Sequence, residues 1–132
     1  LSVCGLAGGS ITNPPLVDLR RRIVLAYDSA NAVLQALAFE GRGRHAALRP
    51  LWRKRDFGCA SHMLLYPDSG EVVLNDYRRF GEEVVVLDIA SGAEKGRVRV
   101  GGWSQGVVFP SPGFSRDLYW SSLSRLARIH VE

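Results

Sequence analysis

The stretch VVVLDIASGAEKGRVRV, residues 84–100, decides the fold expected for this chain. A run of apolar, mostly β-branched residues leads into a Ser-Gly turn, and an alternation of Arg and Val follows the turn. This order is typical of a β-hairpin, because β-branched residues favour strands and glycine favours tight turns. The preceding segments 63–66 and 72–75 flank a second turn at 67–70. The pattern therefore predicts four short strands in succession.

An earlier copy of this four-strand unit precedes the segment. A shift of 50 residues places Asp18 on Asp68 and Leu37 on Leu87. The strands predicted for this copy lie near residues 11–17, 22–27, 33–39 and 47–53. A helix over 29–39 and 46–54 is the competing interpretation, since both segments contain good helix formers. Strands are favoured because the first copy keeps register with a segment too rich in Val to be helical.

A third, shorter copy begins at Ser104. The segment SQGVVFPSPG, residues 104–113, matches SHMLLYPDSG, residues 61–70, in its polar start, its apolar run and its Pro-bearing turn. Pro110 is therefore expected in a turn. The predicted second and third strands of this copy are residues 117–121 and 126–131. This copy is one strand short of the others.

Self-similarity at 40–50 residues, with four short strands in each copy, is typical of β-propeller blades. The fold class we expect is all-β, with three four-stranded antiparallel blades that make half of a six- or seven-bladed propeller. The other half would come from a second chain or from a missing part of this one. The expected units are an N-terminal strand at 1–8, a first blade at 9–56, a second at 57–102 and an incomplete third at 103–132.

The segment VLDIASGAEKGRVRVG, together with LRPLWRK at 48–54, resembles the blade repeat of pyrroloquinoline-quinone-type propellers. That repeat has a strand, an Asp, small residues, Thr/Ser-Gly and a last strand with a tryptophan. The resemblance covers residues 9–132, but only the middle unit has the Asp88 and Ser-Gly turn, and only the first has a tryptophan, Trp52, in its last strand. The adjacent cysteines that quinoprotein alcohol dehydrogenases place over their quinone are absent, so the resemblance implies no quinone here.

A propeller places the first strand of each blade around a central channel, where ligands usually bind. The candidate binding residues are the polar residues at the starts of the three predicted first strands: Thr12, Asn13, Ser61, His62, Ser104 and Gln105. The loops 57–60 and 101–103, which end the units, are candidates together with them, because pockets combine a few polar groups with apolar walls. His62 is more typical of a hydrogen-bonded inner residue than of a metal ligand, so no metal site is predicted.

Other conspicuous residues are interpreted as structural. Asn75 and Asp76 are expected to cap the turn after a strand. The three tryptophans are expected to pack between blades; they are Trp52, Trp103 and Trp120. Cys4 and Cys59 have no metal-ligand spacing and are expected to be buried thiols, with a single disulfide as the alternative.

Composition and charge limit the classes of protein to which this chain can belong. The 132 residues, 46% hydrophobic and 23% charged, are those of a globular domain, and no apolar run has the length of a membrane span. Nine basic and two acidic residues lie in 20–55. Arginines on solvated strands explain this asymmetry better than a phosphate site, because no Gly-rich phosphate loop accompanies them. Nucleic acid is therefore not the expected partner.

The function we expect is that of a non-catalytic propeller module that presents its channel mouth to a small ligand or a protein. The alternative is a metal-dependent, lactonase-like hydrolase with His62 at the metal, which only fold analogy supports. The apolar segment 1–6 would complete the third blade, in a second copy of the chain or across a ring closed by a missing half. The sequence identifies no ligand, catalytic residue, cofactor or compartment, because it contains no nucleophile elbow, zinc-protease motif or phosphate loop.

Overall fold

The fold is seen in a computed structural model that describes residues 14–55, 57–58, 62–78, 81–101, 110–121 and 125–132. In this part of the chain every regular element is a β-strand, apart from one turn of 3-10 helix. Among the same residues no helix is long and apolar enough to cross a membrane. The all-β class expected from the sequence is therefore confirmed.

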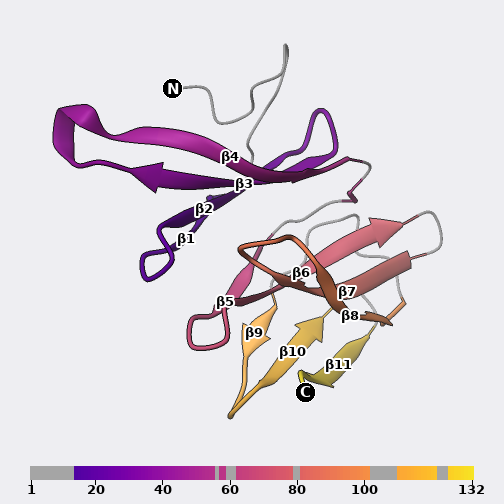
Figure 1. Cartoon of the computed structure of the whole chain (residues 1–132). Coiled ribbons are helices and arrows are strands. Elements are labelled where there is room, and N and C mark those ends of the chain that lie inside the picture. Colours follow the sequence, from indigo (N-terminus) through magenta and orange to yellow (C-terminus); the bar gives the residue numbers. More distant parts are fainter. Residues whose placement is uncertain (1–13, 56, 59–61, 79–80, 102–109, 122–124) are drawn as a thin grey trace.

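The strands form three antiparallel sheets in chain order (Figure 1). The first sheet contains β1 (Leu16–Asp18), β2 (Ile23–Asp28), β3 (Val33–Glu40) and β4 (Ala47–Lys54), with the 3-10 turn η1 (Gly43–His45) between the last two. The second contains β5 (Leu64–Tyr66), β6 (Glu71–Arg78), β7 (Gly81–Asp88) and β8 (Glu94–Arg99). The third contains β9 (Ser111–Pro112), β10 (Asp117–Ser121) and β11 (Leu126–His130).

The first two sheets repeat one another closely, as the sequence pattern predicts. Residues 33–40 and 47–54 are strands, so the helical interpretation of this region is wrong. The β3–β4 pairing shifts register between Ala36 and Leu37, and the β7–β8 pairing shifts between Val86 and Leu87, which are the positions 50 residues later. Because a bulge is a specific local feature of a strand pair, its recurrence at the same spacing supports a repeated unit.

One backbone hydrogen bond recurs in all three sheets and relates the third to the others. The amide of Phe39 donates to the carbonyl of Arg22 at 2.9 Å, and the amide of Ile89 donates to that of Gly70 at 2.9 Å. In the third sheet the amide of Val131 donates to the carbonyl of Arg116 at 3.1 Å. In each sheet this bond runs from the end of the third strand to the residue before the second strand. These positions are therefore equivalent in the three sheets.

The third sheet departs from the sequence prediction at its first strand. The Pro-bearing segment expected to be a turn contains β9, in which Ser111 pairs with Tyr119 and Pro112 with Leu118. Proline is tolerated there because β9 is an edge strand of its sheet. The N–H that Pro112 lacks is not needed for a hydrogen bond to β10. Aligning Pro110 with Pro67 therefore placed the first strand of the third copy wrongly. The strands at 117–121 and 126–130 lie where they were predicted.

The second sheet lies between the other two and packs against both. Alternate residues of a strand point to opposite faces. One face of the second sheet packs on the first sheet through Val72, Leu74, Val85 and Leu87. The other face packs on the third sheet through Val73, Val84 and Val86. These strands read as continuous apolar runs because both of their faces are buried.

Trp52 and Trp120 pack between neighbouring sheets, as expected; Trp103 lies outside the described residues. The indole Nε1 of Trp52 donates to the carbonyl of Ile89 at 2.9 Å and joins β4 to the turn after β7. Gly92 in that turn has a φ of +72°, and a Cβ there would lie 2.6 Å from the Trp52 ring. The Ser-Gly turn is therefore required both by its backbone conformation and by the indole above it.

Trp52→Phe is expected to lower the free energy of unfolding by about 1 kcal/mol, because it removes the indole donor and leaves the Ile89 carbonyl buried without it. Urea denaturation followed by circular dichroism measures this change. Arg49→Gln on the same strand is the control, and its exposed side chain predicts a change within about 0.5 kcal/mol. Equal midpoints for the wild type and Trp52→Phe would contradict the role given to this hydrogen bond.

Candidate functional site

Most of the binding residues predicted from the sequence cannot be placed. The predicted residues Thr12, Asn13, Ser61, Ser104 and Gln105 lie outside the described part of the chain. His62 is described: it is partly buried and precedes β5 by two positions, at the start of a first strand as predicted. The predicted polar ring around a channel therefore stays a prediction.

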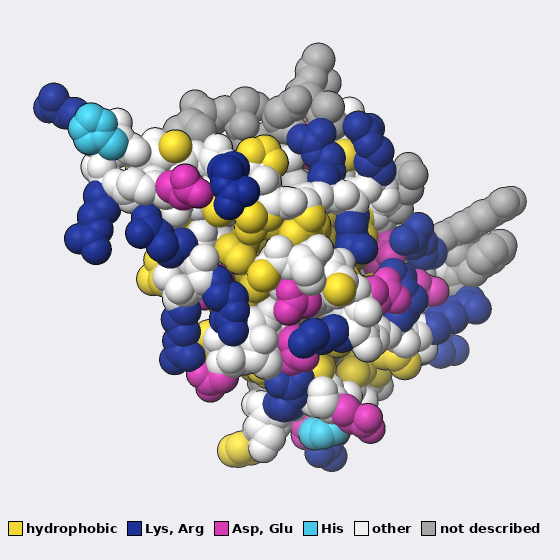
Figure 2. Space-filling model, in the orientation of Figure 1, with side chains coloured by type: hydrophobic (Ala, Val, Ile, Leu, Met, Phe, Trp, Pro, Cys, Tyr) yellow, Lys and Arg dark blue, Asp and Glu magenta, His cyan; other side chains and the backbone are white. Residues whose placement is uncertain are grey.

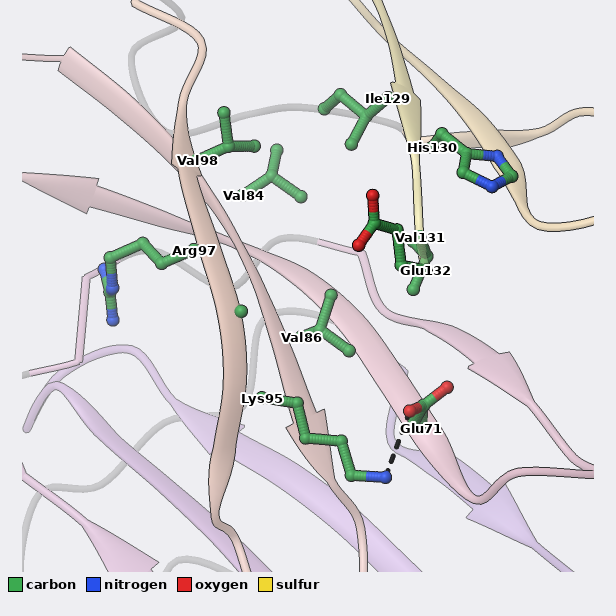
Figure 3. Close-up of a pocket in the computed structure, with 11 residues that line it drawn as sticks. Glu71, Val84, Val86, Lys95, Arg97, Val98, Ile129, His130, Val131 and Glu132 are labelled. Carbon is green, nitrogen blue, oxygen red and sulfur yellow. Dashed lines mark hydrogen bonds and ion pairs between the residues drawn. The ribbon is translucent and has the colours of Figure 1, made fainter.

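A cleft of about 260 Å³ lies between the second and third sheets (Figure 3). Its lining residues come from β6, β7 and β8 on one side and from β11 with the residues after it on the other. They are Glu71, Val84, Val86, Lys95, Gly96, Arg97, Val98, Ile129, His130, Val131 and Glu132. Figure 3 shows Val84 and Val86 in the middle of the cleft, while the ring of His130 points away from it. Five of the eleven lining residues are β-branched and apolar, and the other six are five charged or polar residues and one glycine.

One end of the cleft carries a buried carboxylate with three hydrogen-bond donors. Glu71 accepts hydrogen bonds from Lys95 Nζ at 3.0 Å and from Ser69 Oγ at 2.8 Å. It also pairs with the guanidinium of Arg116, which precedes β10. Burial raises the pKa of Glu71, but the bonds from Arg116, Ser69 and Lys95 more than offset this and lower it from 4.5 to about 2. Glu71 is therefore ionised and fully occupied near neutral pH, which makes it a poor general base.

Arg116 connects the second sheet to the end of the third. Besides pairing with Glu71, it donates from Nε to the carbonyl of Val131 at 2.9 Å and from Nη2 to that of Glu132 at 3.2 Å. Its guanidinium also lies over the Tyr66 ring, with the carbon 5.1 Å from the ring centre. A planar guanidinium can donate hydrogen bonds to all these oxygens and stack on the ring at the same time, which a lysine could not. The polar end of the cleft is consequently rigid.

The cleft opens beside β11, which is an edge strand of the third sheet in the described part of the chain. Within the described residues no strand pairs with the outer edge of β11. Because Val131 bonds to Arg116, the alternation of an antiparallel ladder directs the backbone groups of Arg128 and His130 toward that free edge. Val98 on the facing strand β8 keeps 45% of its surface exposed. An added strand on β11 would cover Val98, as β4 covers the second sheet in the preceding unit.

Asp76 is a second buried carboxylate, and it lies on the side of β8 opposite to the cleft. Asp76 accepts hydrogen bonds from the amide of Gly58 at 2.6 Å and from Arg97 Nη1 at 2.8 Å. Arg97 also pairs with Glu83 and Glu94, and these bonds raise its pKa. The side chain of Arg97 accordingly points away from the cleft in Figure 3.

The prediction that Asn75 and Asp76 cap a turn is wrong. Both lie inside β6, which continues to Arg78, and both are almost fully buried. Asn75 donates to Glu82, another buried carboxylate, at 3.3 Å. The strand can continue through these polar residues because neighbouring groups satisfy their side chains. Their polar side chains led the sequence pattern to end the strand early.

Comparison with known proteins gives no family. No protein-family model, curated protein or solved structure matches the chain. The resemblance to quinoprotein-type blade repeats therefore stays a prediction. Among the described residues no group of three or more His, Cys, Asp or Glu is placed to hold a metal ion. What the cleft can do chemically is bind an apolar or extended segment against its walls and fix its position at the charged end.

Proposed function

We propose that the three sheets are consecutive blades of a β-propeller, and that the protein is a non-catalytic binding module completed to a six-bladed ring by a second copy. The observation that carries this proposal is the face-to-face stacking of the three sheets in chain order, with the second sheet buried on both faces. Closed propellers have about four to eight blades, so three blades need further blades to close a ring.

The first strands support the same arrangement. β1, β5 and β9 are the shortest, with three, three and two residues, and they follow one another along one side of the molecule (Figure 1). The turns after them also meet: Arg21 donates to the carbonyl of Pro67 at 2.8 Å, and Arg116 donates to Ser69 Oγ at 3.3 Å. This order fits a propeller, in which the first strands of successive blades lie next to one another around the central channel.

The outer face of the third sheet supports the need for a partner. Leu118 and Trp120 face the second sheet, so Tyr119 between them faces outward. Tyr119 and Leu126 on this face keep 41% and 75% of their surfaces exposed. A neighbouring blade would remove both from water. In the completed ring the ligand would bind at the channel mouth, where His62 precedes β5.

A second copy predicts a solution mass of twice the chain mass of 14.5 kDa, measured by size-exclusion chromatography with light scattering at tens of micromolar. Leu126→Asp is expected to give a folded monomer, because it places a charge in the proposed interface. Leu126→Met keeps the apolar surface and is expected to remain dimeric. A folded monomer for the wild type, or an unchanged mass for Leu126→Asp, would overturn completion by a second copy.

A further inference from the structure

The β3–β4 hairpin ends in a cationic tip that takes no part in the cleft or in the stacking of the sheets. We use this name for Arg42, Arg44 and His45. All the residues from 41 to 47 are exposed. Figure 1 shows this end of the hairpin extending beyond the rest of its sheet, and Figure 2 shows dark blue and cyan side chains projecting there. The tip is therefore an accessible positive surface.

The arginines of the tip differ from most others in the protein because no carboxylate neutralises them. Arg42 and Arg44 have no ion-pair partner among the described residues. Elsewhere, arginines pair with carboxylates within and between the sheets; these are Arg20, Arg21, Arg49, Arg78, Arg97, Arg116 and Arg128. The charge at the tip is thus available to a partner.

The backbone of the tip is a defined turn. Gly41 has a φ of +74°, and a Cβ there would lie 2.2 Å from the carbonyl oxygen of His45. The amide of His45 donates to the carbonyl of Arg42 at 3.2 Å, which closes the 3-10 turn. Gly41 therefore allows the close approach that turns the chain, and the two arginines extend from a fixed support.

The base of the tip is also held in place. Arg22 donates from Nε to the carbonyl of Phe39 at 3.0 Å and from Nη2 to that of Gly41 at 2.8 Å. Its guanidinium carbon lies 5.3 Å from the centre of the Phe39 ring. Beyond Ala38 the hairpin is two-stranded, because β2 pairs with β3 only up to that residue. Arg53 and Arg55 lie at the other end of β4, where β3 pairs with β2 as well. The result is a short two-stranded ribbon with positive charge at its tip.

We propose that this ribbon binds the phosphate backbone of duplex DNA. A two-stranded β-ribbon fits the major groove of B-form DNA, while the deep, narrow major groove of duplex RNA excludes it. Single-stranded nucleic acid is disfavoured because the tip carries no Phe, Tyr or Trp side chain on which successive bases could stack. The sequence alone favours solvated arginines; the structure adds their position at the end of a rigid ribbon and their lack of carboxylate partners.

Binding of the full chain to a fluorescein-labelled 20-base-pair duplex is to be measured by fluorescence anisotropy over a series of salt concentrations. The double variant Arg42→Gln/Arg44→Gln is expected to bind about tenfold more weakly at low salt. It is also expected to reduce the slope of log affinity against log salt by about 2, since each lost phosphate contact removes about 0.9. Both substitutions are on exposed positions, and circular dichroism verifies that the variant folds.

The matched control is Arg99→Gln/Arg125→Gln, which removes the same charge from exposed positions on β8 and just before β11. It is expected to retain the wild-type salt slope. The proposal is overturned if the wild type does not bind the duplex at low salt, or if the control loses as much affinity as the tip variant. It is equally overturned if the tip variant loses binding only to vesicles of phosphatidylserine and phosphatidylcholine, which would assign the tip to a membrane surface.

Discussion

Trp120→Ala is expected to lower the free energy of unfolding by about 3–5 kcal/mol, the largest effect of any single substitution considered. Trp120 is fully buried between the second and third sheets, where it packs with Val73, Val84 and Leu118. Its removal leaves a cavity in an interface built from only a few residues, which cannot collapse to fill the space. Urea denaturation followed by tryptophan fluorescence and circular dichroism measures the loss.

Two controls separate packing from other effects of this substitution. Tyr119→Ala changes the neighbouring residue on the exposed face. It is expected to cost about 1 kcal/mol or less when both substitutions are compared in the Leu126→Asp background, which lacks the proposed interface. Trp120→Phe keeps an aromatic ring and is expected to cost less than Trp120→Ala, because the indole Nε1 has no hydrogen-bond partner within the described residues. A loss as large for Tyr119→Ala as for Trp120→Ala would contradict the assignment of the two faces.

The parts of the fold that the sequence predicts are those encoded by neighbouring residues. The turn after β7 is an example: the carboxylate of Asp88 accepts hydrogen bonds from the amides of Ala90 and Ser91, at 3.1 and 2.8 Å, and Gly92 follows with a positive φ. Asp, Ser and Gly at these positions are a local signal for a turn. The same holds for the strands on either side, whose β-branched residues form continuous runs.

The buried carboxylates on the two faces of the second sheet could not be found in this way. Glu71 and Asp76 are charged, so the sequence pattern places them at exposed ends of strands, whereas the structure buries both. The arginines that make this burial favourable, Arg116 and Arg97, follow 45 and 21 residues later. Only the stacking of the sheets brings these partners together, and hydropathy along the chain contains no signal for such pairs. The channel residues predicted instead stay a prediction, and His62 is the one among them that the structure describes.

Glu71→Gln is expected to lower the free energy of unfolding at neutral pH by about 3 kcal/mol, which corresponds to a pKa lowered from 4.5 to about 2 at about 1.4 kcal/mol per unit. The substitution leaves the guanidinium of Arg116 without its carboxylate partner between the sheets. Lys95→Gln is the control: the Lys95 side chain is 44% exposed, so its pair with Glu71 is expected to contribute about 1 kcal/mol or less.

The dependence on pH distinguishes this ion pair from a packing effect of the same size. The folded state binds the Glu71 proton less tightly than the unfolded state, so the contribution is complete above about pH 4.5 and is lost as the pH falls toward 2. Unfolding curves of the wild type and Glu71→Gln should therefore differ most at neutral pH and converge between pH 4.5 and 2. Asp18, Asp88 and Asp117 also have lowered pKa values, but they are common to both proteins and cancel in the difference. A difference that stays constant from pH 7 to pH 2 would mean that Glu71 stabilises the sheets through its shape and not through its charge.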